Sequence, residues 1–147
     1  MTFGEEIENE IKEFINKIGN IHYHSDSNYG VEYLNNNFRF LGTKIDLSKE
    51  KNYVSYDFKK NNFLDMMKFF EFKDIKENIL ASNEIHYVGD GITNSELVFS
   101  GKEFFKLLEF LFVNIPEHHY FFDMEKKWCL LIATEGWIDY GEKSIEI

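Results

Sequence analysis

The sequence predicts an α+β fold in which an N-terminal helix and two or three further helices pack on a mainly antiparallel sheet. Three observations support this expectation: the chain opens with a helix-period apolar stripe, strand-like runs follow one another directly, and helical segments separate those runs into blocks. Such an order favours antiparallel pairing. A length of 147 residues, with 44% hydrophobic and 18% aromatic side chains, predicts one globular domain spanning 1–147.

The first predicted element is a helix from Phe3 to Ile18. Glutamates in its first turns complement the helix dipole, and Gly19 is a suitable C-terminal stop. Its apolar side chains recur at a spacing that places them on one helical face: Phe3, Ile7, Ile11, Phe14, Ile15 and Ile18.

The segment that follows, residues 31–58, has the pattern of strands. Val31–Leu34 and Phe38–Leu41 flank three asparagines, which tolerate positive φ angles, so we expect a hairpin with its loop at residues 35–37. Two further strands are expected at Lys44–Leu47 and Tyr53–Phe58, the second with apolar and polar residues in alternation.

The middle of the chain passes from helix back to strand. Residues 61–81 predict one or two helices with a break at 72–74, and their all-round apolar character is typical of a helix that is buried or partly an interface. Glu84–Val88 and Glu96–Phe99 are predicted strands. Asp90-Gly91 has the residue types of a tight hairpin turn between them.

A further helix is predicted from Gly101 to Val113. Ser100 followed by Glu103 is a capping-box pattern, and Pro116 prevents the helix from continuing. We expect this helix to bury Phe104, Leu107, Leu108 and Leu111. The remaining chain predicts an antiparallel meander, with strands at His118–Met124, Lys127–Thr134 and Trp137–Tyr140 and tight turns at residues 125–126 and 135–136.

The charge balance restricts the class of partner. The chain has 26 acidic and 16 basic side chains and a net charge of -10, and residues 81–147 hold 12 of the acidic and 5 of the basic ones. An acidic surface suits a basic protein better than a nucleic acid or a membrane. The single arginine, Arg39, leaves few planar donors for phosphates, so we expect no nucleic-acid partner.

The compartment is predicted from what the chain lacks. Its first residues are acidic and its longest apolar run is interrupted by polar residues, so we expect neither a signal peptide nor a membrane span. One cysteine, Cys129, cannot form an intramolecular disulfide and is expected to be a small buried hydrophobe. We therefore expect a cytoplasmic protein.

Histidines are the strongest candidates for chemistry, but none forms a recognisable motif. His22-x-His24, followed by Asp26, could contribute to a metal site only if a further ligand were supplied from elsewhere. His118 and His119 begin a strand and should point to opposite faces, one buried and one exposed, and His86 is expected to be a satisfied sheet residue. We expect no catalytic residue, metal or cofactor.

The most promising contact surface lies in the last strand and its turn. Tyr and Trp are favoured anchors of protein interfaces, and here they stand among carboxylates on what we expect to be an edge hairpin. The predicted contact residues are Glu135, Trp137, Asp139 and Tyr140, with Asp90 and Glu96 as nearby rim charges. The alternative is that Trp137 packs into the core and Glu135 only occupies a turn.

The ending HHYFFDMEKKWCLLIATEGWIDYG, residues 118–141, follows the capped helix and the Asp-Gly turn. It resembles the C-terminal part of small bacterial immunity proteins that accompany polymorphic or contact-dependent toxins. The resemblance covers about the last third of the chain. It implies a non-enzymatic cytoplasmic inhibitor that binds the catalytic domain of a cognate, basic toxin.

Two alternatives to an inhibitor remain open from the sequence. One is a small metal-dependent or hydrolytic enzyme that uses His22 and His24. The other is a phage or host regulatory adaptor, such as a mimic of nucleic-acid charge, although the carboxylates are clustered and not spaced like phosphates.

Overall fold

The computed structural model describes residues 2–143 and confirms the α+β class. Its main sheet has seven strands, all paired antiparallel, in the order β1-β6-β5-β7-β8-β9-β4. The strands are β1 (His22–His24), β4 (Lys51–Asp57), β5 (Ile85–Gly89), β6 (Glu96–Phe99), β7 (His119–Asp123), β8 (Trp128–Ala133) and β9 (Trp137–Glu142). A separate two-stranded sheet pairs β2 (Phe40–Leu41) with β3 (Lys44–Ile45).

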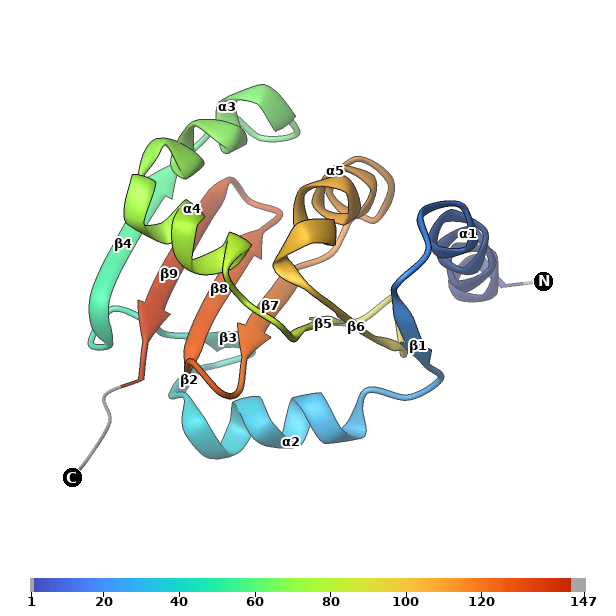
Figure 1. Ribbon diagram of the computed structural model, residues 1–147, viewed down its shortest axis with the longest axis horizontal. Helices are drawn as coiled ribbons and strands as arrows, with labels where there is room; N and C mark the ends of the chain where they lie inside the picture. Colours follow the sequence, from blue (N-terminus) through green and yellow to red (C-terminus); the bar gives the residue numbers. More distant parts are fainter. Residues whose placement is uncertain (1, 144–147) are drawn as a thin grey trace.

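The helices divide unequally between the two faces of the main sheet. Figure 1 shows one helix along the lower face and the others on the opposite side. The lower helix is α2 (Asn28–Asn37), and the upper ones are α1 (Phe3–Ile18), α3 (Phe63–Met67), α4 (Lys73–Leu80) and α5 (Phe104–Asn114). The 3₁₀ helices η1 (Lys68–Glu71) and η2 (Gly101–Glu103) lead into α4 and α5.

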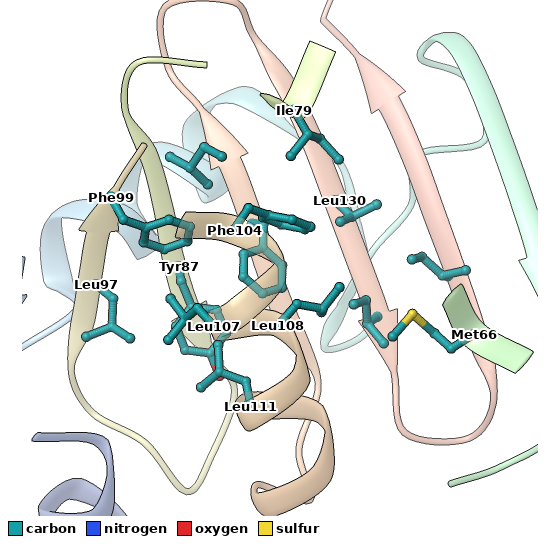
Figure 2. Packing of buried hydrophobic residues seen from close by; sticks show 14 of the residues in the cluster. Met66, Ile79, Tyr87, Leu97, Phe99, Phe104, Leu107, Leu108, Leu111 and Leu130 are labelled. Carbon is teal, nitrogen blue, oxygen red and sulfur yellow. The ribbon is translucent and has the colours of Figure 1, made fainter. Parts of the chain in front are cut away.

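Each face has its own apolar core. The core under α1, α3, α4 and α5 is the larger, and Figure 2 shows Phe104 and its neighbours on α5 packed against Tyr87, Phe99 and Leu130 of the sheet. The core under α2 is smaller and includes Leu34 of that helix. We call the first the four-helix face and the second the α2 face.

Most elements lie where the sequence predicts them. The helix Phe3–Ile18 is present with these bounds, Thr2 caps it through its side chain, and Ile7, Ile11 and Ile15 are buried. A break at Phe72 separates η1 from α4, as expected. The meander β7–β8–β9 is present, with Lys127 and Gly136 at positive φ in its turns.

The predicted hairpin around residues 35–37 is wrong, because residues 28–37 form α2. Gly30 and Leu34, one helical turn apart, are its buried residues. The Gly30 N–H donates to Glu96 Oε1 over 2.8 Å, a contact between positions 66 residues apart. Between α2 and β4, the strands are Phe40–Leu41 and Lys44–Ile45, so the expected strand Lys44–Leu47 is shorter than predicted.

Two details of the predicted local structure also differ. The Ser100 side chain makes no capping hydrogen bond, and its backbone carbonyl instead accepts from Glu103 N as the 3₁₀ turn η2 begins. The β5–β6 connection runs from Asp90 to Ser95 and is not a two-residue turn. The buried carboxylate of Glu117 holds this loop by accepting from Ile92 N and Thr93 N.

Candidate functional site

Three of the predicted contact residues lie together at the turn between β8 and β9. Glu135 is about half exposed, and its Oε2 accepts from Lys44 Nζ over 3.0 Å. The same ammonium group lies 4.6 Å from the ring centroid of Trp137, which is partly exposed. We call Asp90, Glu135 and Trp137, together with Lys44 and His118, the β8–β9 turn surface.

His118 links Asp90 to Glu135 within this surface. Its Nδ1 accepts from Thr134 N over 3.1 Å, which leaves Nε2 as the N–H facing Glu135 Oε1 at 3.4 Å. Its carbonyl accepts from Asp90 N over 3.2 Å. The surface therefore combines two carboxyl groups, one ammonium group and an imidazole.

The two carboxyl groups of the turn surface have opposite pKa shifts. Burial raises the pKa of Asp90, and the negative charge of Glu135 raises it further against the opposing effects of His118 and Lys44. Burial alone would raise the pKa of Glu135. The hydrogen bond from Lys44 and the electrostatic effects of His118 and Lys44 outweigh burial, so the pKa of Glu135 is lowered. Asp90 is therefore protonated more readily, and Glu135 less readily, than the corresponding free side chains.

The other predicted contact residues are buried and do not form an exposed surface. Tyr140 is 1% exposed and its hydroxyl donates to Glu142 Oε2. Asp139 accepts from Ser55 Oγ, and burial raises its pKa. Both lie on β9, which is not the edge strand we expected, because β4 covers it.

Glu96 is also buried and lies far along the sheet from Glu135, on β6. It belongs with four other carboxylates that account for much of the acidic excess in residues 81–147. Five of those 12 side chains are buried: Glu96, Glu103, Glu117, Asp123 and Asp139. Glu117 and Asp123 accept hydrogen bonds from the backbone N–H groups of nearby loops. The acidic residues of the C-terminal region therefore do not form one continuous exposed face.

A second candidate site lies at the opposite end of the α2 face. A cleft of about 440 Å³ opens between the start of α2 and strands β1, β6 and β5. It is lined by His22, His24, Asp26, Tyr29, Glu84, His86, Glu96 and Val98. The fold thus brings the predicted His22-x-His24 pair beside a third histidine and three carboxylates, and we call this the histidine cleft.

His86 is the ordered centre of the histidine cleft. Its Nδ1 lies 2.7 Å from Glu96 Oε2 and its Nε2 lies 3.0 Å from Glu84 Oε1, so it is a satisfied sheet residue as expected. Burial favours the neutral ring, but the hydrogen bonds and charges of Glu96 and Glu84 outweigh it and raise the pKa of His86. The ring is held in one orientation with Nε2 toward the exposed carboxylate.

The histidine cleft does not have the geometry of a metal centre. Within residues 2–143, no group of three or more His, Cys, Asp or Glu side chains is arranged to hold a metal ion. His22 and His24 are both exposed on the edge strand β1. The metal-dependent alternative therefore gains no support from the arrangement of these side chains.

The other histidine and cysteine predictions concern burial. His118 and His119 point to opposite faces, but both are buried, which corrects the expectation that one would be exposed. His119 Nδ1 accepts from Tyr87 on the four-helix face, and burial lowers the pKa of His119 to about 3. Cys129 is buried, as expected, and burial raises the pKa of its thiol.

Sequence reasoning missed Lys44 and His118 as parts of the turn surface, and His86 and Glu84 as parts of the histidine cleft. Lys44 is 91 residues from Glu135, and only the tertiary fold brings them together. Glu84 and His86 are two positions apart in the predicted strand, so their side chains point to the same face. That spacing is a sequence signal for their contact.

Two further findings bear on identity. None of the helices within residues 2–143 is both long and apolar enough to cross a membrane. Comparison of the chain with protein-family models, with curated proteins and with solved structures finds no match.

Proposed function

We propose that this protein is a non-enzymatic inhibitor that binds the catalytic domain of a basic bacterial toxin in the cytoplasm. The observation that supports the proposal is the β8–β9 turn surface, where a partly exposed tryptophan stands beside Glu135 and Asp90. Tryptophan is a frequent interface anchor, and adjacent carboxylates favour lysine or arginine on the partner.

The overall charge supports the same kind of partner. A net charge of -10 raises the association rate with a basic protein and lowers it with an acidic one, and salt weakens both effects. Because five carboxylates of the C-terminal region are buried, the specific contact depends on a few exposed charges and not on a general acidic face.

Co-expression tests the proposal in cells. If a gene beside this one encodes a large secreted protein, the probe is the C-terminal catalytic domain of that protein, expressed with each variant of the chain. We expect the wild type to restore growth and Glu135→Lys to lose protection, because a new lysine would stand beside Lys44. Growth arrest with the wild type contradicts the proposal.

The matched control is Glu125→Lys. Glu125 is also an exposed glutamate in a tight turn, at the other end of β8, so it changes the net charge equally. Equal loss of protection by both variants would show that only net charge matters and would contradict the assignment of the turn surface. Circular dichroism of both variants checks that the fold is retained.

A second candidate function, hydrolysis, is favoured by one observation in the histidine cleft. The buried Glu96 orients His86, and the His86 Nε2, hydrogen-bonded to the exposed Glu84, lies at a cleft that also contains His22 and His24, an arrangement that suits a general acid. We expect turnover of a chromogenic ester or phosphodiester by the wild type and its loss in His86→Asn if this function is present. No turnover of either substrate class by the wild type contradicts it.

A further inference from the structure

An apolar groove runs between α1 and α5 on the outer side of the four-helix face. Phe14 of α1 stacks on Phe110 of α5 with ring centroids 4.2 Å apart, and these two rings form its floor. The groove has a volume of about 520 Å³, and its walls include Ile18 and Val113. Val113 is 64% exposed, which is high for a valine in a helix that is otherwise apolar.

The groove continues to the β8–β9 turn surface. A second hollow, of about 670 Å³, shares Val113 and Asn114 with the first and extends past Phe3 to Thr134 and Glu135. Phe3 is 57% exposed at this end. Apolar side chains with this exposure, joined over two adjoining hollows, are a feature of interaction sites more than of free surface.

The charges along the groove are polarised. Exposed Glu6 lies one helical turn from Phe3, at the end that leads to Glu135, where Lys60 lines the hollow; exposed Glu10 lies one turn before Phe14, toward the middle of the groove. Lys17 and Lys106 stand at the other end, near Ile18, with Glu109. The end that adjoins the turn surface is therefore acidic.

We propose that this groove seats an amphipathic helix of the basic partner, with the helix's lysines or arginines over Glu6, Glu10 and Glu135. This inference rests on the proposed function, because it assigns a second contact to the same partner. A helix laid between two helices buries its apolar stripe in the groove and keeps its charged flank on the rim. The side chains of Phe3 and Val113 would then be covered.

A designed peptide is the probe for the groove. It has 16 residues, with leucines at helical spacing on one face and lysines on the flanks. A first control replaces every lysine by glutamate, and a second replaces every leucine by serine. We expect the lysine peptide to bind, the glutamate peptide to bind at least about tenfold more weakly, and the serine peptide not to bind.

Protein variants locate the binding. Val113→Arg places a charge in the groove at an exposed position, and we expect it to weaken peptide binding at least about tenfold. Leu64→Arg is the matched control, since Leu64 is an exposed apolar residue on α3, outside the groove. Glu6→Lys with Glu10→Lys should weaken binding of the lysine peptide, whereas Lys17→Glu with Lys106→Glu should strengthen it.

Three results would overturn the proposal: no binding of the lysine peptide, equal binding of the lysine and glutamate peptides, or loss of binding in Leu64→Arg as well as Val113→Arg. Sedimentation of the free protein adds a fourth, since a dimer that Val113→Arg dissociates would make the groove a contact between two copies of this chain.

The same variants separate this inference from the proposed function. If Glu135→Lys abolishes binding of the toxin domain and Val113→Arg leaves it unchanged, the inhibitor function stands and the groove is not its contact. If the peptide binds as expected but the toxin domain does not, the groove is a helix-binding site and the proposed partner is wrong.

Discussion

The two faces of the main sheet differ in how they are covered and in where their buried polar groups lie. Four helices cover one face, and the core beneath them is almost entirely apolar. One helix and a two-stranded sheet cover the other, where a smaller apolar core lies between polar groups at both ends. The histidine cleft is at one of these ends and the β8–β9 turn surface at the other.

The comparison explains why the two polar candidate sites, the histidine cleft and the β8–β9 turn surface, both lie on the α2 face. The helix α2 and the two-stranded sheet do not extend over the ends of the strands. Buried polar groups at those ends must form hydrogen bonds with one another. Glu96, His86 and the start of α2 form one such network, and His118, Thr134 and Glu135 form another. On the four-helix face, the buried His119 is instead kept neutral by its surroundings.

The largest effect is expected from the four-helix face. Phe104 is fully buried and contacts Phe70, Phe105 and Phe121 in edge-on ring pairs. Phe104→Ala should lower the free energy of unfolding by about 3–5 kcal/mol, through lost burial and the cavity left behind. Urea unfolding measures the change, and a loss below about 1 kcal/mol would show that this face is not the main source of stability.

The next effect tests the polar network of the α2 face. Glu96→Ala should lower the free energy of unfolding by about 3 kcal/mol, since Gly30 N and His86 both lose a buried partner. Glu84→Gln changes an exposed partner of the same histidine and should change stability by less than about 1 kcal/mol. Equal effects would contradict the central role of Glu96 in holding α2.

Two glycines give effects of opposite sign. A Cβ at Gly30 would overlap Glu96 Oε1 and lie 3.1 Å from Phe122 Cζ, so Gly30→Ala should destabilise the protein by about 1–3 kcal/mol. A Cβ at Gly4 in α1 would meet only Ile92 O, at 3.4 Å, so Gly4→Ala should stabilise by up to about 1 kcal/mol. Thermal unfolding of both variants, compared with the wild type, measures the two changes in stability. Stabilisation by Gly30→Ala would show that α2 lies farther from the sheet than the structure places it.

A different kind of effect is expected in the pH dependence, where a slope is measured and not a difference at one pH. The pKa of His119 is about 3 in the folded protein and about 6.5 when unfolded, so unfolding takes up a proton between these values. Stability should fall as pH drops from 6.5 toward 3, by up to about 1.4 kcal/mol per pH unit from this group. His119→Gln keeps an acceptor for Tyr87 and should remove that part of the slope in urea unfolding across this range; an unchanged slope would mean that His119 titrates normally.

The sequence predicts the four-helix face far better than the α2 face, for a physical reason. Residues Phe3–Ile18 and the α5 segment carry helical periodicity in their own apolar side chains, and the strands of the meander are long apolar runs between turns. These signals are local. The helix α2 has three asparagines at its end and depends on the contact of Gly30 with Glu96, which no local pattern reveals.

The candidate sites divide in the same way. The proximity of Asp90 to Glu135 and the partial exposure of Trp137 agree with the surface predicted from the sequence. The burial of Asp139, Tyr140 and Glu96 does not, because burial depends on β4 covering β9 and on α2 covering β6, both of which are long-range contacts. The residue type alone does not distinguish a carboxylate that contacts a partner from one that accepts hydrogen bonds from a loop.

The most direct test of the account is calorimetric titration of the toxin domain with the wild type, Glu135→Lys and Glu125→Lys at low and at physiological salt. The account predicts that Glu135→Lys weakens binding at least about tenfold at both salt concentrations, whereas Glu125→Lys weakens it only slightly and mainly at low salt. Equal affinities for the two variants, or no binding by the wild type, would contradict it.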